Sequence, residues 1–252
     1  MNNYPIDVRI NHFAIRSFRD TADRDYIHAR LAYQARLIPQ FLWSSLHCLE
    51  KYAKCILLLN RIDGTNIRHE VLESISRLEN KGKFQVNLSK AVQEFIGRLE
   101  SGAEFRYFEV PYCSQEHDIL RLDCAVSELR RYCQPIDYDI EINGGLENQL
   151  EKNLNIIRDK LSSNIKDTCI SNGWLETVIV NKKHPAREAL LWNNLYFGLS
   201  RRKRIRMIPF WESGNAPLYM DPEILNEVVK YVFLPKTVKN AYQDEISGHN
   251  SG

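Results

Sequence analysis

The segment that decides the fold of this chain is QFLWSSLHCLEKYAKCILLLNRI, residues 40–62. Its apolar and small residues recur at helical spacing and form one broad stripe, which contains Phe41, Leu42, Ser45, Leu49, Tyr52, Ala53, Ile56 and Leu59. Such a wide apolar face is typical of the central helix of a bundle, because neighbouring helices must cover it from several sides. Glu50 and Lys54 form an i,i+4 pair in the order that stabilises a helix, and we interpret them as an ion pair.

Similar patterns predict four further helices around this segment. One precedes it, and three follow it, at residues 23–37, 69–79, 89–100 and 114–133. Pro39 separates the first helix from the central one, and Asp63-Gly64 ends the central helix with residues that favour a turn. Because most connections between these segments are short, we expect a bundle of about five helices over residues 1–142.

The pattern becomes mixed after Asn143-Gly144-Gly145, which we interpret as a domain boundary. The elements expected in residues 143–252 are an amphipathic helix at 146–165, short strands at 174–180 and 205–210, a helix that starts at Asp221-Pro222, and a disordered tail, SGHNSG. The sequence therefore predicts a mostly α-helical protein, in which an N-terminal helical bundle is followed by a mixed α/β region with a few short strands.

Composition and cysteine usage favour an ordinary globular protein of the cytoplasm. Hydrophobic residues make up 44% of the chain and charged residues 26%, and the formal net charge is +2. The six cysteines form no C-x-x-C pair and no zinc-type spacing with histidine, so we expect reduced thiols and no metal ligands. The N-terminal sequence lacks the pattern of a signal peptide, and the longest apolar run, residues 55–59, is too short to span a membrane.

Common catalytic motifs are absent from the sequence. It contains no G-x-x-x-x-G-K, G-x-G-x-x-G, G-x-S-x-G or H-E-x-x-H pattern. The usual phosphate-binding loops, serine hydrolases and zinc proteases are therefore excluded as interpretations, and we predict no cofactor.

A series of short motifs instead stands in the order found in a known family: Asp25-Tyr26, Ala29-Arg30, residues 49–58, His69 and Arg106-Tyr107. Through them residues 24–134 resemble the HEPN family, the "higher eukaryotes and prokaryotes nucleotide-binding" helical domains. The resemblance implies a bundle that forms a homodimer and binds a nucleotide, an RNA or a protein partner. It also implies a place in toxin–antitoxin or anti-phage defence systems, where a nucleotidyltransferase-type protein is the expected partner.

Many HEPN proteins are ribonucleases, in which an arginine is followed after four to six residues by a histidine. The nearest pair in this chain is Arg61 and His69, with seven residues between them, and Arg68 directly precedes the histidine. A histidine can move the proton of a 2′-hydroxyl while an arginine steadies the phosphate. A metal-independent endoribonuclease that uses His69 with Arg61 or Arg68 is therefore one hypothesis. Because the spacing departs from the family's pattern, the main prediction is a non-catalytic binding module, in which His69 and Arg61 simply belong to a helix end.

A basic segment in the second half supplies the candidate ligand site. Residues 182–206 contain eight Lys or Arg and one acid, Glu188, an excess of seven positive charges. The predicted ligand-binding residues are Arg201, Arg202, Lys203, Arg204 and Arg206, which follow the aromatic residues Trp192, Tyr196 and Phe197. Cations attract phosphates and aromatic rings stack on bases, so this combination suits RNA. The alternatives are a solvated basic turn, or a structural and oligomeric interaction protein in which the segment serves solubility or assembly.

Overall fold

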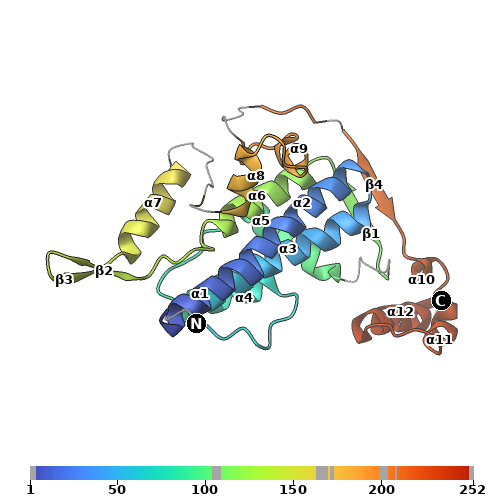
Figure 1. Ribbon diagram of the computed structural model, residues 1–252. Helices are drawn as coiled ribbons and strands as arrows, with labels where there is room; N and C mark the ends of the chain where they lie inside the picture. The colour runs from blue at the N-terminus through green and yellow to red at the C-terminus, as the bar shows by residue number, and fades with distance from the viewer. Residues whose placement is uncertain are drawn as a thin grey trace.

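One long helix, α3 (Ile38–Leu59), lies in the middle of the N-terminal half, and the other helices surround it (Figure 1). The computed structural model describes residues 4–103, 109–162, 170, 173–198, 204–207 and 209–249. The helical elements that pack against α3 are α1 (Ile6–Ala14), the π-helical η1 (Ile15–Arg19), α2 (Asp20–Gln34), α4 (Val71–Lys81), α5 (Lys90–Ser101) and α6 (Asp118–Arg130). The predicted N-terminal helical bundle is confirmed.

The apolar stripe of α3 becomes the centre of the hydrophobic core. Phe41, Leu49, Tyr52 and Ile56 have exposed fractions of 0%, which is the burial that the wide apolar face predicts. Pro39 lies in the first turn of α3, where its missing N–H leaves no helical hydrogen bond unmade. The helix before α3 is longer than predicted, because α1, η1 and α2 follow one another without a break from Ile6 to Gln34.

Short strands and helices make up the rest of the structure, mostly in the second half of the chain. The strands are β1 (Tyr112–Gln115), β2 (Asp139–Ile142), β3 (Gly145–Asn148) and β4 (Trp211–Gly214). The helices are α7 (Leu150–Ser162), α8 (Trp174–Val180), α9 (Arg187–Leu191), α10 (Pro217–Met220), the 3₁₀ turn η3 (Pro222–Ile224), α11 (Leu225–Val228) and α12 (Lys236–His249). This is the mixed region expected from the sequence.

Two antiparallel strand pairs organise this region. β1 pairs with β4 in a register that places Tyr112 opposite Gly214, so the connection between α5 and α6 is joined to a segment about a hundred residues later. β2 and β3 form a hairpin whose turn contains Asn143 at φ 52° and Gly144 at φ 81°. Two successive positive φ angles are those of a type I′ turn, for which Asn-Gly is the preferred pair. The predicted boundary at Asn143-Gly144-Gly145 is thus the tip of a hairpin, which projects with α7 from one side of the bundle (Figure 1).

The prediction of strands at 174–180 and 205–210 is wrong. Residues 174–180 form the helix α8, whose buried side chains Leu175, Val178 and Ile179 follow the i, i+3, i+4 spacing of a helix. Packing of this face against the bundle outweighs the strand preference of its β-branched residues. The described residues 204–207, 209 and 210 form no strand, and β4 begins only at Trp211.

The same hydrophobic core extends from the bundle into the second half. Leu154 and Ile157 of α7, Leu175 of α8 and Leu190 of α9 belong to the core that contains the bundle residues. A second, smaller cluster is formed by Leu218, Leu225, Leu234, Val238 and Tyr242 from the α10–α12 segment. α12 continues to His249, into the tail for which disorder was predicted, and residues 250–252 lie outside the described part.

Two buried arginines fasten the second half to the bundle. Arg130 of α6 donates to Asp23 Oδ1 at 2.8 Å and to Glu176 of α8 at 2.7 Å. Arg30 of α2 pairs with Asp123 of α6, and of these five side chains all but Glu176 are fully buried. Buried charges of this kind are tolerated only where partners satisfy them, so the position of α8 is tightly specified.

No helix of the described ranges is both long and apolar enough to cross a membrane. The cysteines that the structure describes are all free thiols, as predicted: Cys48, Cys55, Cys113, Cys124 and Cys133.

Candidate functional site

Residues 182–193 of the basic segment form a cleft at the turn between α8 and α9. This cleft, which we call the basic cleft, has a volume of about 680 Å³. Its lining includes Lys182, Lys183, His184, Arg187 and Trp192. The first two lysines are exposed on the turn that follows α8. This places several cations and one large aromatic ring around a single concave surface.

No described acid forms an ion pair with a cation of the basic cleft. In the part of the chain that the structure describes, Lys182 and Lys183 form no ion pair, whereas Lys51, Lys54 and Lys83 each contact a carboxylate. Among the described residues that line the basic cleft, Glu188 is the only acid. The positive charge is therefore available to an anion from outside the chain.

Trp192 is held with its ring partly open to solvent. Its exposed fraction is 37%, and its ring centroid lies 6.5 Å from that of Tyr33. Its backbone carbonyl accepts a hydrogen bond from the buried guanidinium of Arg30, which also donates from Nε to the carbonyl of Ala189 at 2.8 Å. Arg30, one of the residues that carry the HEPN resemblance, therefore fixes the backbone on which the basic cleft is built.

The predicted ligand-binding residues are only partly described. Arg204 and Arg206 are exposed, and Asn193 Nδ2 donates to the carbonyl of Arg206 at 2.9 Å. That hydrogen bond ties the strand-free segment 204–207 to the edge of the basic cleft. Arg201, Arg202 and Lys203 lie outside the described residues, as does Arg106-Tyr107 of the HEPN-like motifs.

Arg61 and His69 have separate partners. Arg61, at φ 55°, donates to Asp7 Oδ1 at 3.1 Å and to Asn11 Oδ1 at 3.0 Å, so its guanidinium fastens the end of α3 to α1. His69 lies just before α4, and its Nδ1 is 3.0 Å from Glu50 Oε2. The contacts of the described residues thus do not join the two into one arginine–histidine pair.

Arg68 and His69 instead line a second cleft, of about 710 Å³, near the start of α4. Its wall is completed by Trp43 of α3, Glu70, Glu100 of α5, and residues from the α12 end of the chain such as Phe233 and Lys236. Glu70 accepts a hydrogen bond from the backbone N–H of Arg68 at 2.9 Å. We call this second concave surface the His69 cleft.

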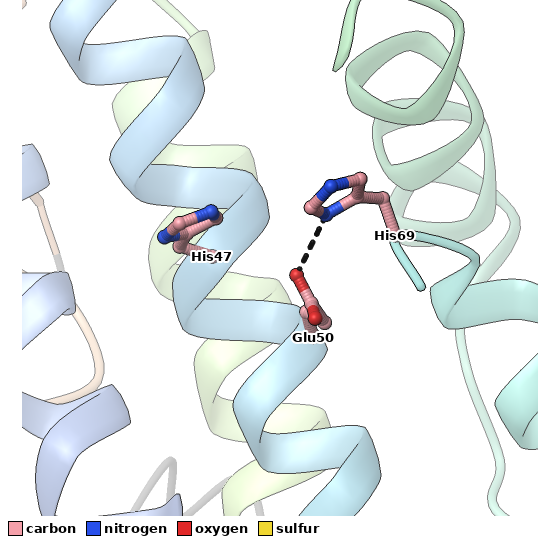
Figure 2. Close-up of side chains that lie close together, drawn as sticks. All are labelled: His47, Glu50 and His69. Atoms are coloured by element: carbon pink, nitrogen blue, oxygen red, sulfur yellow. Dashed lines mark hydrogen bonds and ion pairs between the residues drawn. The ribbon is translucent and has the colours of Figure 1, made fainter. Parts of the chain in front are cut away.

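A cluster of two histidines and one glutamate includes His69 of this cleft. His47 and Glu50 lie on the same face of α3, and His69 approaches them from the segment before α4 (Figure 2). The potential ligand atoms of the three side chains all lie within 4.8 Å of one another. The predicted Glu50–Lys54 ion pair is also present, so the Glu50 carboxylate faces a lysine on one side and His69 on the other.

Burial lowers the pKa of His47 below its usual value, although the neighbouring Glu50 acts in the opposite direction. A lowered pKa favours the neutral imidazole, the form in which a histidine binds metals. Trp43 packs against this ring, with a centroid distance of 4.1 Å, and lies 5.8 Å from the ring of His69.

Sequence reasoning identified His69 and the Glu50–Lys54 pair but did not connect them with His47. The signal was the H-x-x-E spacing of His47 and Glu50, which places both on one helical face. The approach of His69 could not be read from spacing, because a loop of irregular conformation brings it there. Comparison of the chain with protein-family models, curated proteins and solved structures gives no match, so its function must be inferred from the residues themselves.

Proposed function

We propose that this chain is a non-catalytic, HEPN-type helical module that binds single-stranded RNA at the basic cleft. The observation that carries the proposal is that Lys182 and Lys183, which form no ion pair with any described residue, lie on one concave surface with Trp192, whose exposed fraction is 37%. A cationic groove attracts the phosphate backbone of a single strand, and an accessible aromatic ring stacks on a base of any identity.

The extent of the positive surface favours a polyanion over a single nucleotide. Lys182, Lys183 and Arg187 line the basic cleft, and the exposed Arg204 and Arg206 continue the charge along the segment tied to its edge. One phosphate group can engage only a few of these cations at once. A strand with regularly spaced phosphates can use them all, and each contact releases counterions.

The HEPN resemblance of residues 24–134 supports the same proposal, since it implies nucleotide or RNA binding. In this account the bundle is the scaffold, and buried Arg30 connects it to the basic cleft. The proposal includes three further features that the resemblance implies. They are a homodimer of bundles, a nucleotidyltransferase-type protein partner, and a role in toxin–antitoxin or anti-phage defence.

The test is the double variant Lys182→Gln/Lys183→Gln, compared with Lys81→Gln/Lys152→Gln. Both variants remove two exposed lysines, so their net charges are equal, but the second pair lies away from the basic cleft. If each cleft lysine contacts one phosphate, the slope of log K against log salt for single-stranded RNA falls in magnitude by about 1.4 in the first variant. The slope of the control stays at the wild-type value. Equal slopes in the two variants would reject the basic cleft as the RNA site.

A second candidate function is the ribonuclease, which is favoured by Arg68 and His69 lining one cleft. In that case His69 would be the proton-transfer group and Arg68 the phosphate contact. Cleavage of RNA in the presence of EDTA that disappears in His69→Ala would establish it. Intact RNA at high protein concentration would exclude a metal-independent nuclease.

A further inference from the structure

The cluster of His47, Glu50 and His69 has the composition of a metal site. Two imidazoles and one carboxylate are the ligands of many catalytic zinc sites and of facial-triad iron sites. The two residues of α3 are three positions apart, which directs their side chains to the same side of the helix. His69 comes from another segment, so the group would bridge α3 to the start of α4 (Figure 2).

The separations are close to those that an ion requires. Bonds of about 2.05 Å in a tetrahedral arrangement place ligand atoms about 3.3 Å apart. His69 Nδ1 and Glu50 Oε2 are already 3.0 Å apart, and no pair of the three ligand atoms is more than 4.8 Å apart. The widest pair must therefore close by no more than about 1.5 Å, which rotation of one imidazole provides.

The neighbouring side chains hold the ligands in place. The rings of His47 and His69 are nearly parallel, at 13° and a centroid distance of 6.0 Å, and Trp43 packs against both. Lys54 contacts Glu50 Oε1, which leaves Oε2 directed at His69. Support of this kind from residues behind the ligands is what metal sites use to fix ligand orientation.

The surroundings leave room for an additional ligand. The side chain of His69 is 43% exposed and lines the His69 cleft of about 710 Å³. Three protein ligands with an open side are typical of catalytic or exchangeable sites, whereas structural zinc sites are closed by four protein ligands. A water molecule, or an anionic group that enters the His69 cleft, can complete the coordination.

We infer that His47, Glu50 and His69 bind one divalent transition-metal ion, with zinc the best match to two imidazoles and a carboxylate. The ion replaces the hydrogen bond between His69 and Glu50 and leaves the Glu50–Lys54 contact in place. This site is separate from the basic cleft, so metal binding does not depend on the proposed RNA binding.

The experiment is calorimetric titration of tag-free, EDTA-treated and dialysed protein with zinc chloride. Saturation is expected near one ion per chain, together with a rise in the thermal unfolding midpoint on zinc addition. His69→Gln and Glu50→Gln should each weaken zinc binding by at least about tenfold, the lower limit typical even of groups that only support a ligand. Because the side chain of His69 is 43% exposed, its substitution should leave the fold intact. Circular dichroism of both variants checks that they are folded.

The matched control is His117→Gln. His117 Nδ1 lies 3.2 Å from Glu116 Oε1, and the described residues place no third ligand group beside that histidine–glutamate pair. Zinc affinity of this variant should equal that of the wild type. Absence of saturable binding, or equal affinity in the wild type, His69→Gln and Glu50→Gln, would overturn the assignment.

Fluorescence supplies an independent measurement on intact protein. Trp43 lies next to both histidines, so Co²⁺ at the cluster should quench its emission, and Trp43→Phe should lose most of this quenching. The other tryptophans lie at positions 174, 192 and 211, on other elements. Quenching that is unchanged in Trp43→Phe would place the ion elsewhere and overturn the proposal.

Discussion

Asp23 shows at the scale of one residue how the second half of the chain is held to the bundle. Its carboxylate accepts hydrogen bonds from Tyr52 Oη at 2.6 Å, Arg130 Nε at 2.8 Å and Arg130 Nη2 at 3.0 Å, and it has no exposed surface. Arg130 in turn forms a bidentate pair with Glu176. Removing one of the two carboxylates that pair with a buried guanidinium costs much free energy, because the remaining charge is left partly uncompensated.

Asp23→Ala should therefore lower the free energy of unfolding by about 3–5 kcal/mol, because it leaves Arg130 buried with one partner fewer. Urea denaturation measures this loss. Glu73→Ala, which removes the exposed Glu73–Arg77 pair, is the control and should cost less than about 1 kcal/mol. A loss for Asp23→Ala as small as that of the control would show that the buried network is not what holds the structure.

Glu176 gives this network a pH dependence. Burial alone would raise the pKa of Glu176, but the hydrogen bonds and charge of Arg130 outweigh it and hold the pKa below its usual value. A carboxyl group whose pKa is depressed by folding adds stability above its unfolded pKa and loses that stability as the pH falls. The contribution of Glu176 is thus present at neutral pH and is lost on acidification.

Wild-type protein should accordingly lose more stability between about pH 5 and pH 3 than Glu176→Gln, which has no charge to lose at this position. Burial raises the pKa of Asp123, a contribution of opposite sign, but it is common to both proteins and cancels in the difference. Denaturation curves at several pH values provide the comparison. Parallel pH profiles would contradict the role assigned to Glu176.

At the scale of elements, two glycines, one directly after a helix and one inside a helix, differ in how much space surrounds them. A Cβ on Gly82, directly after α4, would lie 2.4 Å from the carbonyl oxygen of Leu78, so the backbone would have to move. A Cβ on Gly97, inside α5, would meet only Leu72 Cδ1 at 3.9 Å, an ordinary contact. Glycine is required at the first position and only tolerated at the second.

Gly82→Ala should destabilise the protein by about 1–3 kcal/mol, as other substitutions that overfill a packed site do. Gly97→Ala should stabilise it by about 0.5–1 kcal/mol, because alanine is favoured over glycine inside a helix. Thermal or urea unfolding of the two variants side by side measures both effects. Changes of the same sign in both variants would contradict the close approach at Gly82.

The elements also show how far the sequence predicts the fold. The stripe of α3 and the patterns of α2, α4, α5, α6 and α7 are strongly periodic, and these helices were predicted. The sequence of α8 predicts a strand because four of its seven residues are β-branched, and so short a segment does not reveal its period. Only its contact with the bundle, through Leu175, Val178 and Glu176, decides in favour of a helix.

At the scale of the whole molecule, both clefts join residues that are distant in sequence. The His69 cleft combines α3 and the start of α4 with Phe233 and Lys236, and the basic cleft depends on Arg30 of α2 for its backbone. The HEPN resemblance pointed to His69, and local composition pointed to the basic segment. It could not place His47 beside His69, because no local pattern encodes a contact between a helix and a loop.

The central claim, that the chain binds RNA without cleaving it, is tested most directly by one incubation. Purified wild-type protein is mixed with a pool of single-stranded RNA in EDTA over a range of salt concentrations, and bound and cleaved RNA are measured in the same samples. The account predicts intact RNA and binding that weakens linearly in log K against log salt. Absence of binding at low salt, or cleavage that His69→Ala abolishes, would contradict it.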